Sequence, residues 1–313
     1  MTDRDRVLES LKAAPDIPVS ELITFILDLR SVIYTSYKED ELKAFQSLFP
    51  DTYIEKGSKE MCGEAGEVAL ISKSHDLAIK ASRSLRDSRC LGALLGYPDC
   101  CIEKHLTNII ADPPVRGAQT IFDSFVSRST ALFLTNNLLN FATRLDSKED
   151  LEQNSFYHQK NNFYLNQFFY LDSDVNPCLI WFAAISFISH LPCRYDCEKS
   201  VKIGRKVAKW MKENIPEVFV FFKNTLQRPF LVFDTFDWIA FEGNVENGFL
   251  RYSKITPPFG VIDSQIKQNL NLGNRLKADK DKIVIFKDDR PVFEYIKKDE
   301  KDGYLMNFVD CEI

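Results

Sequence analysis

The sequence predicts an α+β fold, in which a mainly helical module at residues 1–228, with a short β element, precedes a small antiparallel β-rich module at residues 229–313. Two patterns support this prediction. Apolar residues recur every three or four positions through most of the first module, which is the period of an amphipathic helix. After Pro229 the pattern changes to short aromatic and β-branched runs between turn residues, which is typical of antiparallel strands. A length of 313 residues fits two such modules.

Three helices are expected at the start of the chain. Asp3 or Asp5 can begin the first, Ser20 can begin the second, and residues 38–48 form a third that Pro50 closes.

A short β element follows these helices. Its strands are expected at 52–55 and 67–71, on either side of a glycine-rich turn at 62–66. Helical spacing returns over 77–95, and Gly96 is suited to end that helix because glycine adopts positive φ without strain.

The rest of the chain is assigned by the same patterns. Further helices are expected at 117–145, 178–191, 197–215 and 216–227. The apolar run at 178–191 is shorter than the ~20 residues of a membrane-spanning helix, so we assign it to a buried helix. Residues 148–176, rich in Asn, Gln and aromatic side chains, are interpreted as an irregular or helical connection. Strands are expected at 230–241, 248–255, 283–286, 291–296 and 304–309, with a turn-rich connection at 242–248.

Composition limits the function classes. A net charge of -5 argues against broad nucleic-acid binding, which needs a basic face, although a local basic groove stays possible. The N-terminus lacks the apolar region of a secretory signal, so we expect a cytoplasmic protein without a membrane anchor. In a reducing compartment, the eight cysteines suggest metal ligands or reactive thiols before disulfides.

Two motifs concentrate these cysteines. The first is Gly96-Tyr97-Pro98-Asp99-Cys100-Cys101, and His105 follows it; the second is His190-Leu191-Pro192-Cys193-Arg194-Tyr195-Asp196-Cys197. Proline is favoured at the first position of a helix, so we expect each motif to begin one. The partial positive charge of a helix N-terminus stabilises thiolates, which are the form that binds metals or attacks electrophiles.

Helical spacing then predicts a metal site. Cys101 and His105, like Cys193 and Cys197, are four residues apart and would share one helix face. The candidate ligands are Cys100, Cys101, His105, His190, Cys193 and Cys197. They could form a Cys3His zinc site or an all-thiolate iron–sulfur site, and the supply of thiolates favours iron–sulfur slightly. Asp99, Arg194 and Asp196 are candidate acid–base or substrate-orienting groups, or caps and solvated charges.

Other interpretations stay open. Free cysteines often fill core space, and a dithiol redox site without metal would use the same residues, with Cys62 or Cys90 as a resolving thiol. Either Cys62 or Cys90 could also join the metal site. Cys178 and Cys311 are interpreted as structural.

The two motifs resemble those of a prokaryotic family classed as a domain of unknown function, which combines Gly-Tyr-Pro-x-Cys-Cys with a later His-x-Pro-Cys-x-x-x-Cys. The likeness covers about residues 50–215 and implies a bacterial or archaeal cytoplasmic protein. It also implies that Cys100, Cys101, His190, Cys193 and Cys197 form the site. It implies no particular reaction.

Three functions follow as hypotheses. The first is a metalloenzyme acting on a small molecule by redox or sulfur-transfer chemistry. The second is a non-enzymatic protein with a structural zinc and an interaction surface on the β-rich module. The third is a metal-free dithiol oxidoreductase. The substrate and any protein partner are not predicted.

Overall fold

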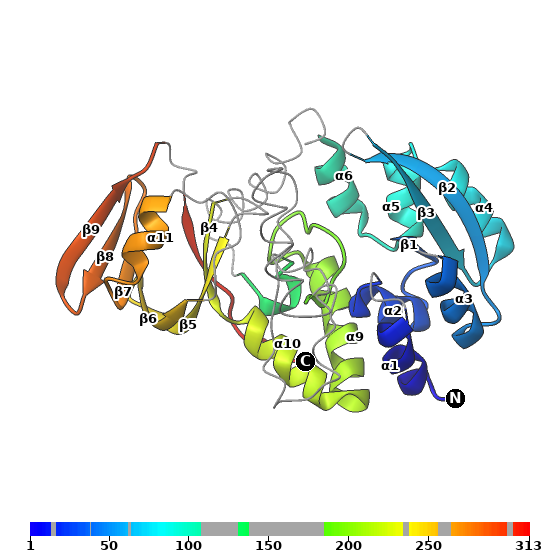
Figure 1. Ribbon diagram of the computed structural model, residues 1–313, viewed down its shortest axis with the longest axis horizontal. Coiled ribbons are helices and arrows are strands. Elements are labelled where there is room, and N and C mark those ends of the chain that lie inside the picture. The colour runs from blue at the N-terminus through cyan, green and yellow to red at the C-terminus, as the bar shows by residue number, and fades with distance from the viewer. Residues whose placement is uncertain are drawn as a thin grey trace.

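The computed structural model describes residues 1–13, 17–37, 39–61, 64–107, 131–137, 185–233, 238–255, 264–298 and 303–313. Helices lie mostly in the N-terminal part and an antiparallel sheet makes up the C-terminal part (Figure 1), so the predicted α+β class is confirmed. None of the described helices is both long and apolar enough to cross a bilayer.

A three-stranded antiparallel sheet forms the centre of the N-terminal part, with strand order β1-β3-β2. Its strands are β1 (Val32–Ser36), β2 (Tyr53–Met61) and β3 (Glu64–Ser72). Neighbouring residues of a strand face opposite sides of the sheet. Accordingly, Val32 and Leu70 belong to one apolar cluster, whereas Ile33 and Ile71 belong to another. The sheet is therefore packed on both faces.

Helices provide the packing on each face. On the Ile33 side lie α1 (Asp3–Ala13), α2 (Val19–Ile26) and α3 (Glu39–Leu48); on the Val32 side lie α4 (His75–Arg83) and α5 (Ser88–Leu94). A further helix, α6 (Asp99–Thr107), packs against α5 and starts at the first cysteine motif.

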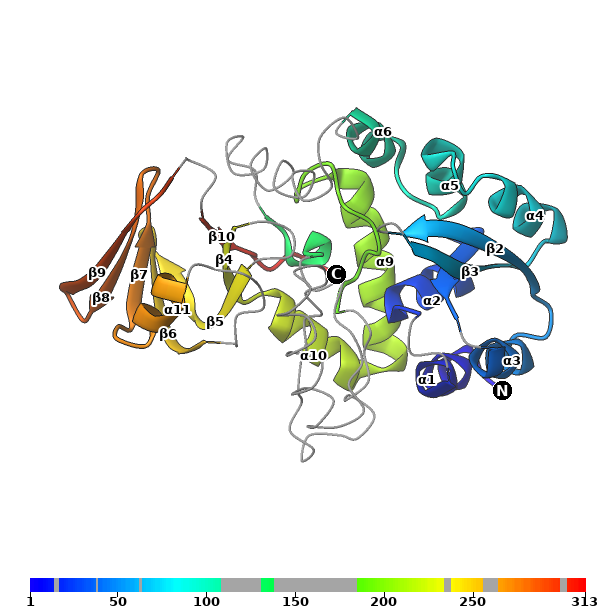
Figure 2. The ribbon, with the colours of Figure 1, turned by 45° about the horizontal axis from the view of Figure 1, so that its top comes forward.

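Two helices lie between the small sheet and the second sheet in both ribbon views (Figure 1, Figure 2). They are α9 (Glu198–Asn214) and α10 (Pro216–Leu226). The buried residues of α9 recur at helical spacing, while lysines and an arginine take its exposed side. This agrees with the helix predicted at 197–215. Proline begins α10, where its missing N–H costs no hydrogen bond.

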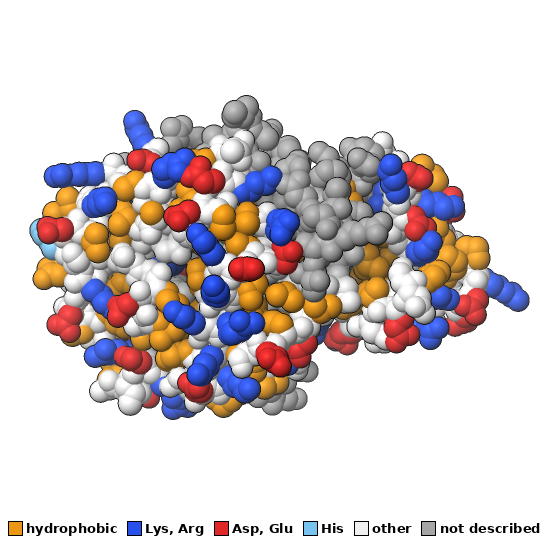
Figure 3. Space-filling view, turned by 180° about the vertical axis from the view of Figure 1, so that it is seen from behind, with side chains coloured by type: hydrophobic (Ala, Val, Ile, Leu, Met, Phe, Trp, Pro, Cys, Tyr) orange, Lys and Arg blue, Asp and Glu red, His pale blue; other side chains and the backbone are white. Residues whose placement is uncertain are grey.

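The second sheet has seven antiparallel strands in the order β10-β4-β5-β6-β7-β8-β9. Its strands are β4 (Pro229–Val232), β5 (Trp238–Glu246), β6 (Phe249–Ile255), β7 (Arg275–Ala278), β8 (Lys282–Lys287), β9 (Arg290–Ile296) and β10 (Tyr304–Asn307). A helix, α11 (Ser264–Leu270), packs Ile266 and Leu270 on one face of this sheet. Seen from behind, basic and acidic side chains are interspersed over both parts of the molecule (Figure 3).

The largest apolar cluster crosses residue 229. Phe230 and Trp238 from the second sheet share it with Phe222 of α10 and Met211 of α9. The first strands of the second sheet are therefore packed into the same core as the helices.

The secondary structure differs from the prediction in the first module. Residues 32–36 form strand β1, although only helices were expected there; pairing with β3 decides the conformation of this short apolar run. The helix expected at 77–95 is two helices, because the Asp87 side chain accepts hydrogen bonds from the backbone N–H groups of Arg89 and Cys90 and caps α5.

Two expected helices are wrong where the structure describes them. In the 117–145 prediction, residues 131–137 contain only a 3₁₀ turn, η2 (Phe133–Thr135). In the 178–191 prediction, residues 185–191 are irregular, and no helix begins at Pro192. Backbone groups in this segment bond to buried side chains instead of to a helix. The Ile188 N–H donates to Ser186 Oγ, and the His190 carbonyl accepts from Asn137 Nδ2. The other residues of both predicted helices, and the connection at 148–176, lie outside the described residues.

In the second module, the connection expected at 242–248 is mostly strand. β5 continues to Glu246, and the turn consists of Asn247 and Gly248, both at positive φ. Positive φ at both central residues is what a type I′ hairpin turn requires, and the twist of this turn matches that of the strands. Strand β7 and helix α11 were not predicted.

Candidate metal centre

The first cysteine pair lies in the first turn of α6. Gly96 has a φ of 74°, and a Cβ at this position would lie 2.3 Å from the carbonyl oxygen of Leu29. Only glycine fits this close approach without strain. Pro98 then precedes α6, and its carbonyl accepts from the N–H of Cys101 at 2.8 Å. The predicted helix start at the first motif is therefore confirmed, with Cys100 half-buried and Cys101 buried.

The second cysteine pair precedes α9 instead of lying within a helix. Cys197 is the N-cap of α9, and its carbonyl accepts the Val201 N–H at 2.8 Å. Cys193 lies in the irregular segment before it, and Tyr195 between them is fully buried against Phe308. The expectation of Cys193 and Cys197 on one helix face is wrong, although the irregular chain still brings the two residues together.

The four motif cysteines converge. The Sγ atoms of Cys100, Cys101, Cys193 and Cys197 all lie within 4.8 Å of one another. The Sγ–Sγ distances are 3.9 Å for Cys100–Cys101, 3.7 Å for Cys100–Cys197 and 3.8 Å for Cys101–Cys197. All four are free thiols in the structure. Four cysteine sulfurs so close together could hold a metal ion.

Backbone and hydroxyl groups support the buried sulfur. The backbone N–H of Cys193 donates to Cys101 Sγ at 3.3 Å, which ties the two motifs directly. Ser200 Oγ, fully buried on α9, lies 3.4 Å from Cys101 Sγ and 2.8 Å from His190 Nε2. His190 therefore contacts the sulfur cluster through Ser200, and its ring packs 5.3 Å from the ring of Tyr97.

A buried arginine joins the segments that precede the two motifs. Arg30 Nε donates to the Leu95 carbonyl at 3.2 Å, and Nη2 donates to Ser189 Oγ at 2.7 Å. Nη1 pairs with the Glu21 carboxylate at 2.5 Å, and this arginine side chain is only 2% exposed. Arg30 therefore links the segments before the two motifs, and Glu21 holds its guanidinium in place. Removing one partner of such a buried ion pair is costly.

Hydrogen bonds among the thiols shift the pKa of three of them. Hydrogen bonds from the Cys101 and Cys193 thiols lower the pKa of Cys197, which carries the charge most readily. Bonds to Cys193 and Cys197 raise the pKa of Cys101 above its ordinary value. For Cys193, the bond with Cys101 lowers the pKa, but the bond with Cys197 and burial outweigh it and raise the value to about 12. Negative charge on all four sulfurs therefore needs a cation.

The predicted histidine ligands lie outside this sulfur cluster. No histidine nitrogen belongs to the metal-binding group that the described residues form. His105 is half-buried one turn further along α6. His190 is buried, and burial lowers its pKa to about 3, so the ring is neutral at physiological pH.

The candidate acid–base residues lie on the surface near the sulfurs. Arg194 and Asp196 form an ion pair with an Nε–Oδ1 distance of 3.0 Å, and both line a surface depression that also includes Cys100 and Cys193. Asp99 is 87% exposed and lies 3.6 Å from Lys199. None of these carboxylates contacts a sulfur through a described hydrogen bond.

The remaining cysteines do not join the cluster where they are described. Cys90 accepts a hydrogen bond from Ser84 at 3.1 Å and packs with the apolar cluster under α4 and α5. Cys311 is half-buried near the end of the chain. Cys62 and Cys178 lie outside the described residues.

Sequence reasoning missed two residues of the site. Ser200 follows Cys197 by three positions and is a polar residue on the buried face of α9, which was a usable signal. Arg30 lies far from both motifs in sequence, and nothing in its surroundings indicated burial.

Comparison of the chain with protein-family models, with curated proteins and with solved structures gave no match. The family resemblance of the two motifs stays a prediction.

Proposed function

We propose that Cys100, Cys101, Cys193 and Cys197 bind one metal ion, with zinc as the best-fitting metal. The spacing of the sulfurs is the observation that supports this proposal. Tetrahedral coordination with Zn–S bonds of about 2.3 Å separates the sulfurs by about 3.8 Å. The three Sγ–Sγ separations among Cys100, Cys101 and Cys197 are 3.7, 3.8 and 3.9 Å, and Cys193 Sγ lies within 4.8 Å of each of these sulfurs.

This spacing favours a single ion over the iron–sulfur cluster that the sequence slightly favoured. Each thiolate of a four-iron cluster binds a different iron, so its sulfurs stand farther apart than sulfurs around one ion. All four Sγ atoms lie within 4.8 Å of one another, which leaves room for one ion at their centre. A single iron in the same tetrahedral site is the alternative metal.

A structural role follows from the number of ligands. Catalytic zinc sites keep one position open for water or substrate, whereas structural sites have four protein ligands. Four thiolates close the site, and the ion would fasten the start of α6 to the start of α9. This corresponds to the second of the three hypotheses, a structural metal within the helical part.

A second candidate is chemistry at the exposed edge of the site. Cys100 and Cys193 are only half-buried and line the depression that contains Arg194 and Asp196. A small substrate could reach these two sulfurs, with the metal activating the thiolate or accepting a ligand in place of one sulfur.

Metal analysis after anaerobic purification tests the proposal. One zinc per chain without acid-labile sulfide is the expected result; iron with an equal amount of sulfide would overturn the single-ion site. A protein that stays metal-free when zinc is supplied would leave the dithiol hypothesis. Cobalt replacement then separates the two roles: azide should leave the absorption of a closed Co(II) site unchanged, and a changed spectrum would favour the second candidate.

A further inference from the structure

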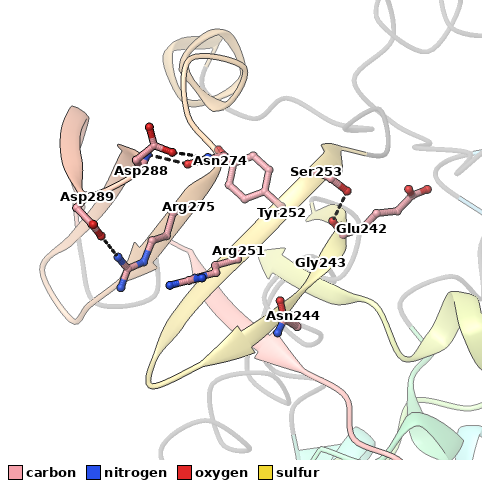
Figure 4. A pocket seen from close by; sticks show the side chains of 10 residues that line it. All are labelled: Glu242, Gly243, Asn244, Arg251, Tyr252, Ser253, Asn274, Arg275, Asp288 and Asp289. Atoms are coloured by element: carbon pink, nitrogen blue, oxygen red, sulfur yellow. Dashed lines mark hydrogen bonds and ion pairs between the residues drawn. The ribbon is translucent and has the colours of Figure 1, made fainter.

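A hollow of about 500 Å³ lies on the second sheet, far along the chain from the cysteines (Figure 4). Strands β5, β6 and β7 form its floor, and the turn between β8 and β9 forms one side. Polar and charged side chains line most of it, so its chemistry depends on which charges already have partners.

Two arginines face each other in this hollow. Arg251 of β6 and Arg275 of β7 are directly paired in the antiparallel register. Paired residues on one face have Cβ atoms about 4.5–5.5 Å apart, and like charges in this position destabilise a sheet. Figure 4 shows the guanidinium of Arg251 extending toward that of Arg275.

The acidic residues around the hollow are already engaged. Glu242 lies 3.5 Å from both Arg228 and Lys254. Asp289 pairs with Arg275 at 2.7 Å.

The other two charged residues that line the hollow are Asp288 and Arg251. The Asp288 carboxylate accepts a hydrogen bond from Asn274 Nδ2 at 3.1 Å. Among the charged residues that line the hollow, the side chain of Arg251 alone has no hydrogen bond or ion pair within the described part of the chain.

Arg275 is held in place by two neighbours. Its guanidinium stacks on the ring of Phe249, with Cζ 3.8 Å from the ring centroid, and Asp289 fixes Nη1. Gly243 of β5 approaches the backbone of Arg251 closely, because a Cβ at Gly243 would lie 2.0 Å from the Arg251 carbonyl oxygen. A held guanidinium, that of Arg275, and an exposed guanidinium without a described partner, that of Arg251, therefore lie on adjacent strands.

We propose that Arg251 and Arg275 bind an oxyanion, either the phosphate or the carboxylate group of a small ligand. A guanidinium presents a planar fork of N–H donors that matches the oxygens of both groups. Asp289 already offsets the charge of Arg275, so an anion between the two forks chiefly gives Arg251 the side-chain partner that it lacks. The proposal is independent of metal binding at the cysteines.

Calorimetric titration of the full chain with inorganic phosphate, and separately with succinate, tests this site at low ionic strength. We expect saturable binding of at least one of the two anions, and the anion that binds identifies the group recognised. Arg251→Gln should weaken that binding at least tenfold. Arg290→Gln, which removes an exposed arginine outside the hollow, is the matched control and should leave it unchanged.

Absence of binding by both anions at millimolar concentration would overturn the proposal. Equal affinities of R251Q and the unmodified protein would do the same. If R290Q weakened binding as much as R251Q, the effect would be non-specific screening of surface charge, and the assignment to this hollow would be wrong.

Discussion

Replacing Cys101 with serine is expected to weaken zinc binding sharply. Cys101 is the most enclosed motif sulfur: it contacts Cys100, Cys197 and Ser200, and it accepts the Cys193 N–H. Structural zinc sites bind with about 10–16 kcal/mol, so one thiolate of four accounts for about 3 kcal/mol. This corresponds to a loss of roughly a hundredfold in affinity.

Competition with a chromogenic zinc chelator under reducing, anaerobic conditions measures this loss. Cys311→Ser is the matched control, because Cys311 is a half-buried free thiol outside the cluster. Cys100→Ser provides a second variant at a half-buried position that should fold even if C101S does not. Affinity in both C101S and C100S equal to that of C311S would refute the four-sulfur site.

Four further predictions concern stability and protonation. Arg30→Met should lower the free energy of unfolding by about 3–5 kcal/mol, because Glu21 stays buried without its partner; in urea denaturation, adding Glu21→Leu should recover part of this, and no recovery would contradict the ion-pair explanation. The metal-free protein should lose stability as pH falls from 6.5 toward about 3, since unfolded His190 binds a proton that the buried ring does not. His190→Gln should flatten this dependence, and an unchanged pH profile would refute it. Gly96→Ala should lower the free energy of unfolding by more than about 1 kcal/mol in thermal denaturation. This loss should exceed that of Gly248→Ala, because both glycines have positive φ but a Cβ at Gly248 would meet no other atom. Zinc binding at neutral pH should release protons, because thiols such as Cys193, with a pKa near 12, must ionise; calorimetry in buffers of different protonation enthalpy would reveal this, and heats independent of buffer would contradict it.

The sequence predicted the first motif better than the second because their local signals differ. Pro98 stands just before a helix whose first turn carries both cysteines, and nothing else competes for that backbone. Pro192 has the same local context, but residues after it bond to distant side chains, and α9 begins six residues later. Thr135, for example, donates to the Tyr195 carbonyl. Such long-range bonds have no signature in the motif itself.

The metal-ligand prediction depended on that second helix. With Cys193 and Cys197 placed four apart on a helix, His105 was the natural counterpart of Cys101 at the same spacing. Cys197 is instead the N-cap of α9, and its sulfur lies close to the sulfurs of Cys100 and Cys101 at the start of that helix. The cysteines converge without a histidine, and His190 lies behind Ser200.

Strand β1 shows the same limit in the fold. Val32–Ser36 is a five-residue apolar and hydroxyl run without a period long enough to distinguish strand from helix. Its conformation is fixed by pairing with Val68–Ser72, more than thirty residues later, and by the clusters on the two faces of the sheet.

The separation of the cysteine motifs along the chain has a consequence during protein synthesis. Cys193 lies 92 residues after Cys101. At about 5–20 residues per second, the ribosome needs roughly 5–20 s to deliver the second pair after the first. Throughout that interval the nascent chain carries two adjacent thiols at the start of α6 without their partners. If the four cysteines bind one metal ion as proposed, its coordination can be completed only after Cys197 has been added, and until then the first pair of thiols is the pair open to oxidation.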